Sequence, residues 1–515
     1  MVMPPLLDRN RGRGLAAVAI FSLVQGAAAG AAAFATRGLF AAMHEGATLP
    51  VTGLVVLVAA GAFIAVTRVA ARQWGERIGQ DYAREIRRAL FTHAAHMPAR
   101  AVAQRRSGYM SLRFVGDMGA FRNWLGRGLP TLVSGVVLVP VTLMVLWLLS
   151  PAFAFVVAPV LGLTLVLITL GGLRLVPLQR RLRVRRARIA ADMAERMPLA
   201  PYLDRLGRRG KELAQLDRRT DAMISAALQH RCNAETIKAL PDVAVGIAAA
   251  LVVLAGVRAG LDTGRVAAAL AALGLLVSPL RDLGSVWNDR AAYRAAVVKA
   301  NAVLIRPGRR LYRKGKSFPK GVIDVVFRDV LLPSGHVLNA TVAPRSNFCL
   351  SLGEWDAEAV MDMLLGLDAP AEGQILLSGV DLCDLSQGSL RRGVLRVGAT
   401  QEILQGSLRR VLLLGVTDRP DDAALDVLAR EGGLGALLDR LGGLDGTVWE
   451  GGRNLTRRER QCISLVRMRL FRPRLILVGS DCDLSQSPQF RRYVKRRGAT
   501  VIRASELVQA MPSAA

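Results

Sequence analysis

Residues 129–173, LPTLVSGVVLVPVTLMVLWLLSPAFAFVVAPVLGLTLVLITLGGL, give the clearest indication of the fold of this chain. This stretch contains no charged residue, and Ser150-Pro151 divides it into two apolar runs. A helix needs roughly 20 apolar residues to cross a hydrocarbon core about 30 Å thick. The stretch therefore predicts two membrane-spanning helices that are joined by a short uncharged turn.

Four more apolar segments lie in the first 300 residues of the chain. Two of these segments precede residues 129–173 and are also long enough to span a bilayer. The two segments that follow residues 129–173 are shorter and are bounded by arginines. All six together predict an α-helical polytopic membrane domain with six transmembrane helices, at approximately residues 15–35, 51–71, 129–149, 152–173, 239–257 and 266–280.

The distribution of Lys and Arg predicts the topology. Arginines crowd the N-terminus and the stretches 72–127 and 174–238, whereas the loop Met43–Pro50 contains no Lys or Arg. Because basic residues accumulate on the cytoplasmic side, both termini and the C-terminal domain are expected in the cytoplasm of a bacterial inner membrane. The two Arg-rich stretches predict long cytosolic helical extensions that turn at Met97-Pro98-Ala99 and near Leu206-Gly207.

The strongly basic composition is interpreted as membrane-flanking charge. The formal net charge is +29, but the arginines lie beside apolar runs and have no interleaved aromatic residues that could stack on bases. We therefore expect lipid and no nucleic acid as a partner. The five cysteines form no C-x-x-C pair, and the histidines lack metal-ligand spacing, so neither a disulfide framework nor a metal site is expected.

The composition changes after residue 304. Residues 305–322, IRPGRRLYRKGKSFPKGV, read as a basic linker held near anionic lipid headgroups. In residues 323–515, short apolar runs alternate with helical patterns, which predicts an α/β domain with a mainly parallel sheet. The expected strands include Val322–Val326, Phe348–Leu352, Gln374–Leu377 and Leu475–Val478. The expected domains are therefore 1–304, 305–322 and 323–515.

The C-terminal domain resembles the nucleotide-binding domain of an ABC exporter half-transporter. Three stretches carry the likeness: LLGLDAPAEGQILLSGVDLCD (364–384) with SLRR (389–392), VWEGGRNLT (448–456), and the following helix with Arg460-Gln461, Arg467 and Pro473-Arg474. In the membrane half, SPLRDLG (278–284), RFVGD (113–117) and NWL (123–125) are similar to the same family. The resemblance covers nearly the whole chain, and it implies a P-loop-NTPase-like C-terminal fold and a dimer of two halves.

The family's P-loop holds phosphate with glycine amides and a lysine. The matching stretch here is SLGEWDAEA (351–359), and no lysine lies between Lys320 and Lys495. We interpret Glu354, Asp356 and Glu358 as carboxylates in the first helical turn that take the place of phosphate at the helix N-terminus. The degenerate P-loop positions are Ser351, Gly353, Glu354, Asp356, Ala357 and Glu358.

The family's hydrolytic groups are also absent from the matching positions. Gly479 and Ser480 follow the strand at 475–478 where the family has the magnesium-binding Asp and the catalytic Glu, and no Glu lies between Glu459 and Glu506. The last histidine is His336, and the switch position matches Glu506. The resemblance therefore predicts no ATPase activity, no cofactor and no binding of ATP or Mg²⁺.

Two further motifs bear on a partner chain. The signature motif, which the family presents across a partner's nucleotide, is degenerate here: Leu455, Thr456, Arg457, Arg458 and Glu459. Thr456 is still expected to cap a helix. The X-loop, which in the family touches the cytosolic ends of the membrane helices, is retained as a coupling interface at Val448, Trp449, Glu450, Gly451 and Gly452.

Two functions are the main hypotheses on these residues; a third, an ATPase with a rebuilt site that uses Asp481 and the arginines of Thr456–Arg460, would require phosphate binding without lysine. The first is a catalytically inactive, ABC-exporter-like membrane subunit, the non-hydrolysing half of a dimeric transporter with a second half-transporter as partner. The second is a non-transporting scaffold, assembly or regulatory subunit of another membrane complex. Gln25, Arg37 and Arg68 are polar residues in or beside the apolar segments and are candidates to line a translocation path.

Overall fold

The computed structural model describes residues 3–46, 48–103, 118–398, 403–479 and 487–505 of the chain. It consists of two compact units, and the division does not follow the sequence in a single cut. The first unit comprises residues 1–95 and 105–306, and the second comprises residues 96–104 and 307–515.

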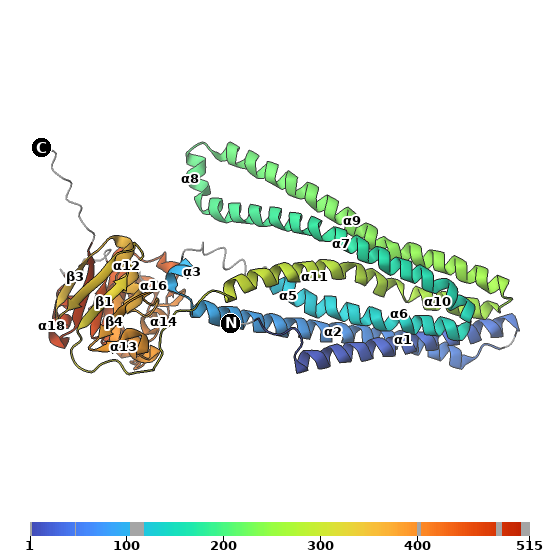
Figure 1. Ribbon diagram of the computed structural model, residues 1–515, viewed down its shortest axis with the longest axis horizontal. Helices are drawn as coiled ribbons and strands as arrows, with labels where there is room; N and C mark the ends of the chain where they lie inside the picture. Colours follow the sequence, from blue (N-terminus) through green and yellow to red (C-terminus); the bar gives the residue numbers. More distant parts are fainter. Residues whose placement is uncertain (1–2, 47, 104–117, 399–402, 480–486, 506–515) are drawn as a thin grey trace. The chain divides into compact units, whose positions relative to one another are not determined.

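The first unit is a bundle of long helices (Figure 1). Within the described residues, six helical stretches are long and apolar enough to cross a membrane, which confirms the predicted number of spans. The elements are α1 (Arg9–His44), α2 (Val51–Ala95), α5 (Met118–Asn123), the π-helical η1 (Trp124–Gly128), α6 (Leu129–Leu149), α7 (Pro151–Arg196), η2 (Met197–Leu199), α8 (Ala200–Arg205), α9 (Arg209–Arg258), α10 (Thr263–Gly274) and α11 (Val277–Leu304).

The predicted turns lie where the backbone demands them. Proline starts α7 one residue after Ser150, which adopts an extended conformation and ends α6. Gly207 has a φ of +65°, a left-handed conformation that glycine adopts without steric cost, and it separates α8 from α9. In Figure 1, α7 and α9 run side by side and diverge from the other helices of this unit toward α8. The second predicted cytosolic extension is therefore helical.

Helix α2 packs against η1 with almost no side chain between the two backbones. An ideal Cβ on Gly79 would lie 2.5 Å from the carbonyl oxygen of Arg122, and one on Gly75 would lie 2.4 Å from the carbonyl oxygen of Gly126. Only glycine permits such an approach. An aromatic cluster continues the contact, since Phe121 packs edge-on against Tyr82 and Tyr293.

The second unit contains two four-stranded sheets (Figure 1). One is parallel, with the order β3 (Asn347–Ser351), β10 (Thr500–Ser505), β9 (Leu475–Val478) and β6 (Val394–Val397). The other is antiparallel, with the order β2 (Val337–Val342), β1 (Val325–Leu331), β4 (Gln374–Leu377) and β5 (Val380–Asp381). The predicted strands are thus present, but two of the four belong to the antiparallel sheet, so the expectation of a mainly parallel sheet holds for only one layer.

The remaining elements surround these sheets. They are α3 (Ala99–Ala103), α12 (Glu354–Leu364), η3 (Leu382–Asp384), α13 (Gln387–Gly393), β7 (Gly406–Ser407), α14 (Leu408–Leu413), α15 (Asp422–Ala429), η4 (Arg430–Leu434), α16 (Gly435–Leu441), β8 (Thr447–Val448), η5 (Glu450–Gly452), α17 (Arg457–Phe471) and α18 (Pro488–Arg497). Strand β7 pairs with β8. The core of the unit is apolar, and all four residues of β9 are buried.

The basic linker belongs to this second unit and does not stand free of it. The backbone N–H groups of Arg313 and Lys316 donate to the carbonyl oxygens of Cys383 and Asp384, at 2.8 and 2.9 Å. The ammonium of Lys314 also lies 3.0 Å from a carboxylate oxygen of Asp384. Part of the charge and backbone of this segment is therefore engaged with η3, and its location near lipid headgroups stays a prediction.

Candidate functional site

The P-loop position lies between β3 and α12. Strand β3 ends at Ser351 and α12 begins at Glu354, so only Leu352 and Gly353 connect them. Ala357 is buried in the first turns of α12, and Glu354 is exposed at its first position. A triphosphate would find neither a lysine nor a glycine-rich cradle in this connection. The residues present do not fit the group, and no step of ATP chemistry is assigned to them.

The other two carboxylates of α12 do not serve its N-terminus. Asp356 is buried, and its carboxylate accepts hydrogen bonds from the backbone N–H and hydroxyl of Ser334, at 3.2 and 2.5 Å. Glu358 lies in the second turn and accepts two hydrogen bonds from the guanidinium of Arg396, at 2.6 and 2.7 Å. Glu354 and Asp356 thus lie in the first turn of α12 as expected, whereas Glu358 lies one turn later, so the interpretation of three first-turn carboxylates is wrong for Glu358 alone. Both partners are distant in sequence, so local patterning could not reveal them.

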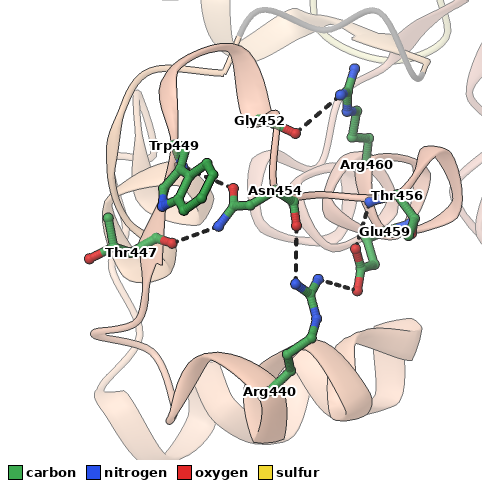
Figure 2. A network of polar contacts seen from close by, with 8 residues as sticks. All are labelled: Arg440, Thr447, Trp449, Gly452, Asn454, Thr456, Glu459 and Arg460. Carbon is green, nitrogen blue, oxygen red and sulfur yellow. Dashed lines mark hydrogen bonds and ion pairs between the residues drawn. The ribbon is translucent and has the colours of Figure 1, made fainter. Parts of the chain in front are cut away.

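The signature position forms a capped helix start (Figure 2). The Thr456 hydroxyl accepts from the backbone N–H of Glu459, and the Glu459 carboxylate accepts from the backbone N–H of Thr456. This capping box confirms that Thr456 caps α17. Burial raises the pKa of Glu459, but the hydrogen bonds from Thr456 and Arg440 outweigh it and hold this pKa below its ordinary value. Leu455 is buried, whereas Arg457 and Arg458 are exposed.

The X-loop is tied to the signature motif by Asn454. Its side-chain oxygen accepts from the backbone N–H of Trp449, and its amide donates to the carbonyl oxygen of Thr447, both at 2.9 Å (Figure 2). Arg440 bridges the Asn454 carbonyl and the Glu459 carboxylate, at 3.1 and 2.7 Å. The geometry makes the two motifs one rigid element. Sequence analysis did not single out Asn454 or Arg440.

Only part of the predicted coupling interface is available for contact. Val448 is fully buried, because β8 pairs with β7 and faces the core, and Gly452 is buried beside Ile403. Trp449, by contrast, is 58% exposed, and Glu450 and Gly451 are exposed too. Val448 and Gly452 are therefore corrected to structural positions, and the exposed surface is Trp449–Gly451.

The remaining ATPase-related positions are only partly described. Gly479 follows β9 as expected, and its backbone N–H donates to the Val397 carbonyl oxygen at 3.3 Å. Ser480 and the switch position Glu506 lie outside the described residues.

Residues 96–103 belong to the second unit, and the sequence did not reveal the contacts that they make there. The Arg100 guanidinium donates twice to one carboxylate oxygen of Asp368, at 2.8 and 3.0 Å. The backbone N–H of Ala99 donates to the Leu367 carbonyl oxygen, and that of Arg309 donates to the His96 carbonyl oxygen, at 3.0 and 2.8 Å. The turn after α2 was predicted, but its partners are hundreds of residues away in sequence. Residues 96–103 are thus docked on the rest of the second unit.

Replacement of Arg100 by alanine is expected to release residues 96–103. The side chain of Asp368 is only 8% exposed, so its charge would lose its main partner. Loss of a hydrogen bond to a charged group costs about 1.5–3 kcal/mol. Hydrogen exchange of this segment should therefore accelerate about 10- to 100-fold. The exposed Arg310, replaced by alanine, is the control, and unchanged protection in R100A would contradict the assignment.

Asp362 predicts a pH-dependent stability of α12. Burial raises the pKa of this carboxyl from 3.8 to about 6, against the lowering effects of Arg396 and Arg100; Glu358 and Asp368 add to the rise. Above pH 6 the Asp362 carboxyl is charged in the folded protein, although its surroundings disfavour the charge. Below the pKa that Asp362 has in the unfolded chain, the carboxyl is protonated in both the folded and the unfolded protein. Asp362→Asn should therefore stabilise the protein by about 1 kcal/mol at pH 7.5, allowing for partial exposure. This gain should vanish by pH 4 in thermal melts, and an equal gain at both pH values would exclude titration of Asp362.

The membrane unit contains a cavity of about 480 Å³. Helices α1, α2, α6 and α11 supply its walls, and two of the three polar residues selected from the sequence, Gln25 and Arg68, line it. Arg37 does not line it, and its backbone carbonyl packs instead against Gly264 of α10. Other charged lining residues are Arg72, Glu76, Arg127 and Asp282.

Comparison with known proteins identifies the membrane half directly. The family model described as the ABC transporter transmembrane region matches residues 15–229. A mycobactin import ATP-binding/permease protein, IrtB, of Mycolicibacterium thermoresistibile is 31% identical over 204 residues, which are 36% of this chain and 33% of that protein. A multidrug efflux ATP-binding/permease protein of Mycobacterium bovis is 27% identical over 50% of this chain and 22% of that protein. These matches span a third or less of the relatives' length.

Longer but weaker matches extend through the C-terminal unit. An uncharacterized ABC transporter ATP-binding protein, YfiC, of Bacillus subtilis is 21% identical over 79% of this chain and 69% of that protein. The structure of a bacterial Atm1-family ABC exporter with ATP bound superimposes with a TM-score of 0.78 at 19% identity, covering 97% of this chain and 92% of that one. The fold of the whole chain is therefore that of an ABC exporter half.

The names of the relatives correct one prediction from the sequence. The relatives from M. thermoresistibile, M. bovis and B. subtilis are all named as ATP-binding proteins. This finding contradicts the expectation of no ATPase activity, and it gives no support to the expectation that no nucleotide is bound. The family model, the relatives and the fold agree: the chain is a multi-pass membrane protein whose residues 15–229 match the ABC transporter transmembrane region and whose fold is that of an ABC exporter half.

Proposed function

We propose that this chain is one half of a dimeric transporter and moves a solute across the bacterial inner membrane together with a second half-transporter. The observation that carries the proposal is the cavity of about 480 Å³ in the membrane unit, with charged side chains from α2 and α11 on its walls. Charged residues at membrane depth are costly, and they persist where they line a path or bind a ligand. A purely structural shell has no use for such a cavity.

The partner is proposed to be a different chain that carries a P-loop lysine. The relatives are named ATP-binding/permease proteins, so ATP is the energy source expected for the assembled pair. Between Lys320 and Lys495 this chain has no lysine to hold the β- and γ-phosphates. Helix α2 also exposes apolar side chains for lipid or a second half to cover, among them Val51, Val55, Val58, Val66 and Val69.

The arrangement of the chain follows from this proposal. Residues 1–304 are assigned to the membrane domain, 305–322 to the linker and 323–515 to the nucleotide-binding-type domain, with both termini cytoplasmic because Lys and Arg crowd that side. Within the last domain we assign residues 351–358 to the P-loop position, 455–459 to the signature position, Gly479–Ser480 to the magnesium-binding position, Glu506 to the switch position and Trp449–Gly451 to the coupling surface.

A second candidate function is a scaffold or regulatory subunit of another membrane complex. The start of α17 favours it, because the Glu459 carboxylate already occupies the N-cap backbone N–H and two arginines follow Thr456. A partner's phosphate would meet those exposed guanidinium groups where the family presents backbone amides. This arrangement would alter any site that is shared across a dimer.

Purification of the tagged full-length chain from its native membrane in mild detergent tests the proposal. Mass spectrometry should identify a stoichiometric half-transporter with a complete P-loop, and the pair reconstituted in liposomes should show ATP-dependent solute movement. A half-transporter partner without transport, or recovery of unrelated membrane proteins only, would reject the transport function and leave the scaffold.

A further inference from the structure

Among the residues that the structure describes, one cation that lines the cavity of the membrane unit has no acidic partner. Among the charged lining residues, Arg127 donates two hydrogen bonds to the carboxylate of Asp289, at 3.0 Å each. Arg72 lies 3.7 Å from Asp282, and Glu76 lies 3.9 Å from Arg122. Arg68 forms no ion pair with any residue in the described part of the chain. The local charge is therefore positive at Arg68.

The position of Arg68 makes this positive charge significant. The residue lies near the end of the apolar run of α2, which begins at Val51 and belongs to a span of sufficient length to cross a membrane. Arg68 is exposed, and a guanidinium in such a span needs an anion or water to compensate its charge. A bound anion would supply the missing partner in a charge-assisted hydrogen bond, which is about twice as strong as a neutral one.

Neutral hydrogen-bonding groups accompany the cation. Gln25 of α1, Thr131 of α6 and Ser278 of α11 line the same cavity, and all three side chains are partly buried. The rest of the wall is largely apolar and includes Ile64 and Leu138. Half of the lining residues are polar or charged, so the wall is more polar than that of most small-molecule sites, while the volume lies within their range of roughly 300–1,000 Å³.

We propose that this cavity binds an organic anion, a carboxylate or phosphate on an apolar body, with Arg68 as its anion-binding residue. The inference rests on the proposed function for its meaning as a substrate class, but the binding itself needs neither a partner chain nor ATP. The cavity volume of about 480 Å³ suits a small amphipathic molecule. The same chemistry is offered by a soluble solute and by an anionic lipid headgroup.

Two probes with one apolar body and opposite charges test the proposal. Dansylglycine carries a carboxylate, and dansylaminoethyl-trimethylammonium carries a fixed positive charge. Fluorescence anisotropy is measured on the full-length chain in a zwitterionic detergent. The chain should bind dansylglycine saturably and should not bind the cation. Failure to bind either probe, or equal binding of both, would overturn the proposal.

Three variants assign the effect to Arg68. Arg68→Gln should weaken dansylglycine binding at least tenfold, and Arg68→Lys should keep most of it, because the charge remains. Arg88→Gln is the matched control, since Arg88 is exposed on the same helix, does not line the cavity and carries the same charge. An equal loss in R68Q and R88Q would show that only net charge matters and would reject the site.

Competition distinguishes the two sources of the anion. Short-chain phosphatidylglycerol that displaces dansylglycine from the wild type, and loses this effect in R68Q, would assign the cavity to a lipid headgroup. Lack of displacement would assign it to a soluble organic anion. If the chain binds the anion but has no transporter partner, the proposed function is rejected and the anion site is kept. If the chain transports a solute but does not bind the anion, the anion site is rejected and the proposed function is kept.

Discussion

Replacement of Gly79 by alanine is expected to destabilise the membrane unit strongly. The new Cβ would lie 2.5 Å from the Arg122 carbonyl oxygen and 2.9 Å from the Cα of Gly126. Both are backbone atoms, so no rotamer change relieves the overlap, and α2 must move away from η1. Overpacking of this kind costs about 3 kcal/mol.

The same helix supplies the control for this prediction. Gly61 has no atom within 4 Å of an ideal Cβ, and alanine is the better helix former. Gly61→Ala should therefore leave the melting temperature unchanged or raise it slightly. Both variants are compared by fluorescence-detected size exclusion after heating, where G79A should lose its monodisperse peak several degrees earlier. Equal melting of G79A and G61A would mean that α2 and η1 do not pack this closely.

Removal of the Arg127 side chain should have the second largest effect. The Asp289 side chain is 8% exposed, and its two oxygens accept from the two nitrogens of Arg127. Arg127→Ala would leave a charge buried between η1 and α11 without its partner. We expect a cost of about 3 kcal/mol, at the lower end of the range for broken buried pairs, because Arg127 itself is 61% exposed.

A double-mutant cycle separates this pair from a general effect of truncation. Asp289→Asn removes the charge but keeps an acceptor, so D289N alone should cost less than R127A. In the D289N background, Arg127→Ala should cost about 1 kcal/mol or less, because no buried charge is left behind. A full additional loss in the double variant would show that Arg127 acts through something other than Asp289.

Much of the architecture could be predicted from the sequence. Apolar runs of sufficient length located the membrane spans, and Ser150-Pro151 and Gly207 located two turns, because a bilayer and the backbone act on short stretches of chain. The capping box at Thr456 was also visible, since it involves only residues three positions apart. The predicted fifth and sixth apolar runs covered only part of their helical stretches, Arg209–Arg258 and Thr263–Leu304, because these stretches continue well beyond the apolar runs into charged sequence.

The candidate sites were predicted less completely. Glu358 was placed at the helix start, but its partner Arg396 lies on β6, and only the folded sheet brings the two together. Val448 was placed on a coupling surface, but pairing of β8 with β7 turns it inward. The expectation of no ATPase activity came from residue types alone, and the names of the relatives overturned it.

Local patterns in the sequence were sufficient to predict which segments are long and apolar enough to span a membrane, where two of the turns lie, and that an α/β unit follows. These properties arise from hydrophobicity, helix-breaking residues and charge within windows of about 20 residues. The folded structure was needed to show that residues 96–103 dock on Leu367 and Asp368, that α2 meets η1 through glycine backbone, and that Gln25 and Arg68 share one cavity whereas Arg37 does not line it. Such contacts join residues far apart in the chain, and they depend on the packing of whole helices and sheets, which no local pattern encodes.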